Sequence, residues 1–232
     1  MKKSLFALLS ISLLLTSCEE PVDNFENAAA YVGSIWKAES TTITRTKGLS
    51  TSDSEVNNIE LEMDNLTFVE PEYSHEKVTS VSALLFIKSL SKEELGGFVD
   101  LIIRVSDEGT NYEKTYKIDE IQEANIQLMA VDSFFDFYKT RNEVGFKRVM
   151  DDTEISDSIA GLVYNTMLAI DSAYGVINKL TVTGFTFSEM DDIPVIKAWI
   201  DVENGGYLTR YVLGIARTNG KVVYVGMNEA QE

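Results

Sequence analysis

The spacing of apolar residues changes at residue 119, and this change limits the fold more than any other feature of the sequence. Before it, apolar and polar residues alternate, most clearly over 59–64 (IELEMD), as in a strand with one buried face. After it, the apolar residues recur at steps of three and four: Ile121, Ala124, Leu128, Val131, Phe135 and Tyr138. This spacing predicts a helix with one buried side, beginning near Asp119 and Gln122. We therefore expect an α+β protein.

A second helix is predicted after a short break. Asp151, Asp152 and Glu154 place negative charge at its start, where the helix dipole favours it, and Gly175 ends it. Its buried side is expected to contain Ile155, Ile159, Leu162, Val163, Met167, Ile170 and Tyr174. The two helices need each other and a sheet to cover their apolar sides.

Four strands are predicted to form that sheet, over 180–187, 195–202, 207–216 and 222–227. Asn219 and Gly220 separate the last two. Both residues tolerate the positive φ angles of a two-residue primed turn, so the sequence predicts an antiparallel hairpin here.

The first half is predicted to be an antiparallel β unit. Apolar runs over 81–90 and 98–105 lie on either side of Gly96-Gly97, and residues 112–118 alternate again. The first run also fits a helix, but the glycine pair and the β-branched residues of the second run favour paired strands.

Two further segments of this half have weaker patterns. Residues 28–47 are ambiguous, because Tyr31, Ile35 and Trp36 fit one side of a short helix whereas residues 41–44 favour a strand. Residues 49–58 are rich in Ser, Asp and Asn and predict a loop.

The chain begins with a basic and then apolar leader. Lys2 and Lys3 precede the run from Leu5 to Leu15, which is shorter than the roughly 20 residues of a spanning helix, and small residues lead to Cys18. Leu15-Thr16-Ser17-Cys18 resembles the lipobox of bacterial lipoproteins. The resemblance implies cleavage before Cys18 and lipidation of its sulfur, so that acyl chains hold the mature protein on a membrane.

The expected organisation follows from these features. Residues 1–17 form a lipoprotein signal peptide, 18–30 a lipidated tether, 31–118 a β-rich N-terminal domain and 119–232 a second α+β domain. The acidic residues after Cys18 resemble the export signals of Bacteroidetes surface lipoproteins. We expect an outer-membrane protein, lipid-anchored on the periplasmic face or at the cell surface.

The net charge and the number of cysteines limit which binding partners and which cross-links we expect. The formal net charge is −17, which repels nucleic acid and anionic lipid surfaces, so nucleic-acid binding is not expected. Cys18 is the only cysteine, and its lipidation leaves no disulfide. The fold must therefore be held by its core.

The order helix, helix and four-stranded meander over 119–228 resembles the cystatin/NTF2-like fold of small bacterial lipoproteins. The junction at Tyr174-Gly175 and the final hairpin are the local features that carry this resemblance. In such folds a curved sheet wraps around helices and can form a pocket lined by aromatic residues. Here the resemblance implies a ligand site at Trp199, Tyr207 and Tyr211, although aromatic residues in strands are also ordinary core residues.

The residues offer little catalytic chemistry. His75 is the only histidine and lies in a polar segment that we interpret as a solvated loop. The acid pairs Glu93-Glu94, Asp151-Asp152 and Asp191-Asp192 are interpreted as solvated faces, because sequence neighbours point apart. We assign no catalytic residue and no metal ligand, and we expect no cofactor.

Two functions remain open. The first is a non-enzymatic binding or assembly module of the cell envelope, with a protein or glycan partner. The alternative is a hydrolase that uses distant carboxylates on glycans, which the acid-rich composition suggests.

Overall fold

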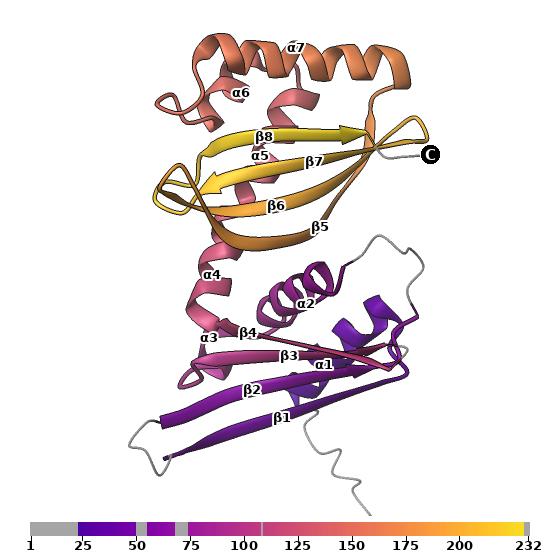
Figure 1. Ribbon diagram of the computed structural model, residues 1–232, viewed down its shortest axis with the longest axis vertical. Helices are drawn as coiled ribbons and strands as arrows, with labels where there is room; N and C mark the ends of the chain where they lie inside the picture. The colour runs from indigo at the N-terminus through magenta and orange to yellow at the C-terminus, as the bar shows by residue number, and fades with distance from the viewer. Residues whose placement is uncertain (1–22, 50–54, 68–73, 108, 230–232) are drawn as a thin grey trace, which may run out of the picture.

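The computed structural model describes residues 23–49, 55–67, 74–107 and 109–229. The predicted signal peptide, Cys18 and residues 18–22 of the predicted tether lie outside this part of the chain. Within it, the chain forms two halves, each with helices and one four-stranded sheet (Figure 1). The prediction of an α+β protein with largely antiparallel sheets is confirmed.

The first sheet contains β1 (Ser40–Leu49), β2 (Glu55–Asp64), β3 (Asp100–Asp107) and β4 (Thr110–Lys117), in that spatial order. The pairs β1–β2 and β3–β4 are antiparallel, but β2 and β3 are parallel, which corrects the prediction of a purely antiparallel unit. The physical reason is the connection, because parallel neighbours need a long crossover and this one contains a helix. The predicted loop over 49–58 is also too long, since β2 begins at Glu55.

The crossover helix is α2 (His75–Lys88), followed by the single turn of α3 (Lys92–Leu95). The prediction of a strand over 81–90 is therefore wrong. The Ser74 side chain accepts a hydrogen bond from the Lys77 amide and begins the helix as an N-cap. Side chains are buried on most sides of α2, because it lies between the two sheets (Figure 1), and this hides the helical spacing.

The chain enters the first half through α1 (Asn24–Trp36), which Asp23 caps by accepting a hydrogen bond from the Phe25 amide. The predicted tether over 18–30 is thus wrong from residue 24 onward, because Phe25, Ala28 and Ala29 are buried in the core. Both structures that were considered for residues 28–47 occur there, because the helix ends at Trp36 and a strand begins at Ser40.

The predicted helix from residue 119 is confirmed but is broken at Leu128 into α4 (Ile118–Gln127) and α5 (Met129–Lys139). The short helix α6 (Glu143–Val149) was not predicted. The next helix, α7 (Asp157–Tyr174), begins later than expected, at the N-cap Ser156.

The buried side of α7 also differs from the prediction. Ile155 and Met167 are buried as predicted, but Ile159, Leu162 and Tyr174 are 51%, 66% and 41% exposed. Ala160 and Tyr164 are buried in their place. The sequence does not reveal that the smaller Ala160, and not its large neighbours, faces the protein.

The second sheet is an antiparallel meander of β5 (Ile177–Met190), β6 (Ile193–Asn204), β7 (Tyr207–Ala216) and β8 (Val222–Glu229). The predicted hairpin between β7 and β8 is confirmed, but its two-residue turn is wrong. Ala216 bonds to Lys221 across a four-residue connection in which only Gly220 has positive φ. The two-residue turns with two positive φ angles are instead Asp191-Asp192 and Gly205-Gly206.

The two halves are packed together through α2 and α4. The amide of Phe185 on β5 donates a hydrogen bond of 3.1 Å to Ser80 Oγ on α2, so the helix satisfies a backbone group at the edge of the second sheet. A Cβ atom at Gly184 would lie 2.7 Å from Lys77 Cγ, and glycine is what lets α2 approach the strand.

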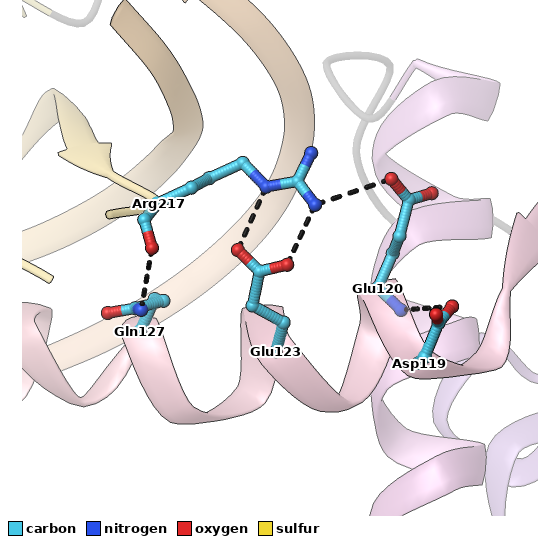
Figure 2. Close-up of polar contacts among 5 residues, drawn as sticks. All are labelled: Asp119, Glu120, Glu123, Gln127 and Arg217. Atoms are coloured by element: carbon cyan, nitrogen blue, oxygen red, sulfur yellow. Dashed lines mark hydrogen bonds and ion pairs between the residues drawn. The ribbon is translucent and has the colours of Figure 1, made fainter. Parts of the chain in front are cut away.

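At α4, Arg217 from the β7–β8 connection reaches across to the helix (Figure 2). Its Nε and Nη2 atoms donate to the two carboxylate oxygens of Glu123 at 2.9 and 2.7 Å, and Gln127 Nε2 donates to the Arg217 carbonyl at 3.1 Å. The hydrogen bond from Arg217 lowers the pKa of Glu123. One continuous set of buried apolar side chains runs through both halves.

Candidate functional site

The three predicted aromatic ligand residues do not meet in one place. Tyr211 is buried, its ring packs edge-on against Phe135 at 5.4 Å, and desolvation raises its pKa to about 12. Ile200 is its register partner on β6, so Trp199 projects from the opposite face of the sheet. Tyr207 is 52% exposed at the far end of β7, against Tyr174.

The Trp199 ring is half-buried and carries two cations. Lys77 Nζ lies 5.9 Å and Lys197 Nζ lies 5.6 Å from its centroid. These contacts occupy ring surface on which a planar ligand would stack. Ligand binding at Trp199 stays a prediction that the arrangement of these side chains does not favour.

Each acid pair has a structural role in the part of the chain that the structure describes. Glu94 completes a capping box with Ser91, and Asp191-Asp192 forms a turn. Asp151 is buried, which corrects its interpretation as a solvated residue, and it accepts hydrogen bonds from Thr153 and Asn219 that lower its pKa. His75 begins α2 and stacks on Tyr112 at 5.7 Å, so it is not in a loop.

A hollow of about 310 Å³ lies at one end of the first sheet. Carboxylates of Glu62, Asp64 and Glu113 line it together with Arg104. The arginine is already engaged, because its Nε bonds to Glu113 at 2.7 Å and its Nη1 to Glu60 at 2.6 Å. The guanidinium therefore pairs with carboxylates of the two neighbouring strands, β2 and β4.

A larger hollow, of about 660 Å³, lies between α1 and β1, and we call it the α1–β1 groove. One wall comes from a single stripe of α1 with small or acidic side chains: Glu26, Ala29, Ala30, Gly33 and Ser34. Their spacing of three, four, seven and eight places them on one side of the helix. The other wall is the segment from Ala38 to Ile43.

Two observations define the shape of the α1–β1 groove. Consecutive residues of β1 line it, and consecutive side chains point to opposite faces of a sheet, so the groove runs along the edge of the strand. A Cβ at Gly33 would lie 2.0 Å from Thr41 Oγ1, so helix and strand meet closely at this point. Glycine at 33 therefore sets how near α1 lies to the strand.

The edge of β1 faces this groove without a neighbouring strand. β1 is the first strand of its sheet and pairs only with β2 among the described residues. Every second residue of an edge strand directs its N–H and C=O outward. The α1–β1 groove thus combines a shaped hollow with backbone hydrogen-bonding groups, and we take it as the candidate functional site.

Comparison with models of protein families, with characterised proteins and with solved structures gives no significant match. The lipobox and the cystatin/NTF2-like resemblance therefore stay predictions. Among the described helices, none has the length and apolar character needed to cross a membrane. No cluster of three or more metal-binding side chains occurs in the described ranges.

The α1–β1 groove was missed at the level of sequence because its residues form no catalytic or metal-binding motif. Two signals point to it in hindsight. Alanine, glycine and serine recur at helical spacing in 29–34, and residues 41–44 (TTIT) form a strand without charge. Neither signal shows that the two segments face each other.

Proposed function

We propose that this protein is a lipid-anchored envelope lipoprotein that acts as a non-enzymatic binding or assembly module, with the α1–β1 groove as its binding surface. The observation that supports it is the combination in one place of a groove of about 660 Å³ and an uncovered strand edge. Lipid on Cys18 would attach the chain only a few residues before α1, because the helix begins at Asn24. The groove would then lie near the membrane, within reach of other envelope components.

Anchoring is tested by labelling cells with a radioactive fatty acid and separating membrane from soluble fractions. The parent chain is expected to carry label and to sediment with the outer membrane. Cys18→Ser is expected to lose the label and its membrane association. Equal fractionation of the two chains would contradict the anchoring.

Binding at the α1–β1 groove is tested by placing a photo-reactive amino acid at Ser34, which is exposed and lines the groove. Irradiated cells are expected to give a discrete cross-linked species, and Ala30→Arg in the same chain is expected to abolish it by filling the groove. A matched control is Ala173→Arg, on an exposed position of α7. If Ala30→Arg leaves the cross-link unchanged, the groove is not the binding surface.

A second candidate function is a carboxylate-dependent glycan hydrolase, and one observation favours it: Glu62, Asp64 and Glu113 border a common hollow. Turnover of envelope glycans that disappears in Glu62→Gln would support this function over the first.

A further inference from the structure

We infer that the α1–β1 groove takes an extended basic segment of a partner protein, which adds to β1 as a further strand of the first sheet. This inference rests on the proposed binding function and names the kind of partner. Three observations support it: the unprotected edge of β1, the small side chains of α1 and the charge of the residues that line the groove.

The strand edge beside the groove lacks the features that normally prevent pairing. Edge strands are usually protected by charged residues, proline, bulges or a covering element. From Ser40 to Thr44 the sequence is STTIT, and the pairing of β1 with β2 has no register shift. Positive charges appear only further along, at Arg45 and Lys47.

The same molecule protects another edge. β5 is an edge strand of the second sheet, and α2 covers it with the hydrogen bond from the Phe185 amide to Ser80. At β1, the helix α1 touches the strand where Gly33 meets Thr41, and along the rest of the groove it presents small side chains. An added strand would lie about 4.8 Å from β1 in the plane of the sheet, so these small residues need to make room only for those of its side chains that face α1.

The length of the groove sets the length of the bound segment. Residues 40–43 line it, and a strand advances about 3.3 Å per residue, so the contact covers roughly 13 Å. A segment of about four to six residues fits this span. Specificity would come from the alternate side chains of the segment that face α1.

Charge selects a basic segment. The charged residues that line the groove are Glu26 and Glu39, and both are acidic. The chain as a whole has a formal charge of −17, so a second copy or an acidic segment is repelled. Alternating lysine or arginine would pair with these two carboxylates.

The test measures the binding of fluorescent octapeptides to the full chain in detergent, by anisotropy. The first set of peptides alternates lysine with threonine, valine or isoleucine. The second set has glutamate in place of lysine. The third set repeats the lysine peptides with a methyl group on the backbone nitrogen of every second residue. At least one lysine peptide is expected to bind in the micromolar range. Methylation is expected to weaken binding tenfold or more, because it removes the N–H groups that pair with the strand. The glutamate set is expected not to bind.

Substitutions in the protein show where the peptide binds. Ala30→Arg and, independently, Ser34→Arg are expected to weaken binding at least tenfold, while Ala173→Arg leaves it unchanged. Glu26→Gln with Glu39→Gln is expected to weaken binding about threefold to tenfold and to reduce its salt dependence. Amide exchange over residues 40–46 is expected to slow when peptide binds. Circular dichroism confirms that each variant is folded.

The outcomes separate the two proposals. If methylated peptides bind as well as the parents, or glutamate peptides bind better, strand addition by a basic segment is wrong while groove binding survives. If both groove variants bind like the parent, the groove itself is wrong and the proposed binding surface falls with it. A concentration-dependent dimer abolished by Ala30→Arg identifies a second copy as the occupant and overturns the inference. If no lysine peptide binds at a concentration of 1 mM, the inference is also wrong.

Discussion

Gly205 and Gly206 form the turn between β6 and β7, and both have positive φ, at 56° and 97°. Their surroundings differ. A Cβ at Gly205 would lie 2.1 Å from the Tyr174 carbonyl oxygen, whereas nothing lies within 4 Å of one at Gly206. Gly205 therefore allows the hairpin to touch the end of α7.

This pair makes a matched test. Gly206→Ala is expected to lower the free energy of unfolding by about 1–2 kcal/mol, which is the cost of a left-handed backbone for alanine. Gly205→Ala adds a clash with backbone, worth about 1–3 kcal/mol more. Urea unfolding followed by circular dichroism measures both. Equal losses would show that the approach to Tyr174 is easily relaxed.

Turn chemistry also shows how far single residues can be predicted. Asn219-Gly220 is the strongest dipeptide signal for a primed turn, yet only its glycine has positive φ, and the connection has four residues. Asp191-Asp192 has both positive φ angles, at 50° and 66°, without a glycine. There the strands on either side, paired from Met190 and Ile193, impose a conformation that aspartate tolerates.

Among the elements, α2 is where sequence reasoning failed for a clear physical reason. Helical spacing is visible only when one side of a helix stays wet. Because α2 lies between the two sheets, even Thr79, Ser80 and Ser82 are buried, and its apolar run resembles a strand. α5 has an exposed side, and its spacing was predicted correctly.

Ser80→Ala tests the contact between α2 and β5. The Phe185 amide would lose its acceptor in a buried position, so the free energy of unfolding is expected to fall by about 1–3 kcal/mol. Ser89→Ala, at the exposed C-cap of the same helix, is the control, and it should change stability by less than about 0.5 kcal/mol because the hydrogen bond it removes, to the Leu85 carbonyl, is exposed to water. Thermal unfolding gives both values. Equal stability of the two variants would mean that water replaces Ser80.

For the whole molecule, the sequence predicted two halves, and it did not predict how they are joined. A boundary at residues 118 and 119 remains a prediction, although apolar packing continues across it. The contact between Arg217 and Glu123 joins residues 94 positions apart, and no local pattern signals it. The α1–β1 groove escaped prediction for the same reason, since it exists only where two segments meet.

The Arg217–Glu123 contact is tested by a double-mutant cycle with Arg217→Met and Glu123→Gln. A coupling energy of about 0.5–1 kcal/mol is expected at pH 7, because both side chains are partly exposed and solvent weakens the pair. The folded state lowers the pKa of Glu123, so this stability is present above its ordinary value of 4.5 and is lost as the pH falls further. Coupling that persists unchanged at pH 3 would contradict the ionic origin.

The position of α2 has a consequence for the order in which the chain can mature. One side of α2 meets β3 and β4, which are made soon after it, but the other waits for β5, which ends only at Met190. During synthesis, roughly a hundred residues must emerge before this helix is fully enclosed. Until then its buried hydroxyls and apolar side chains stay accessible, and a chaperone has its longest opportunity to bind there.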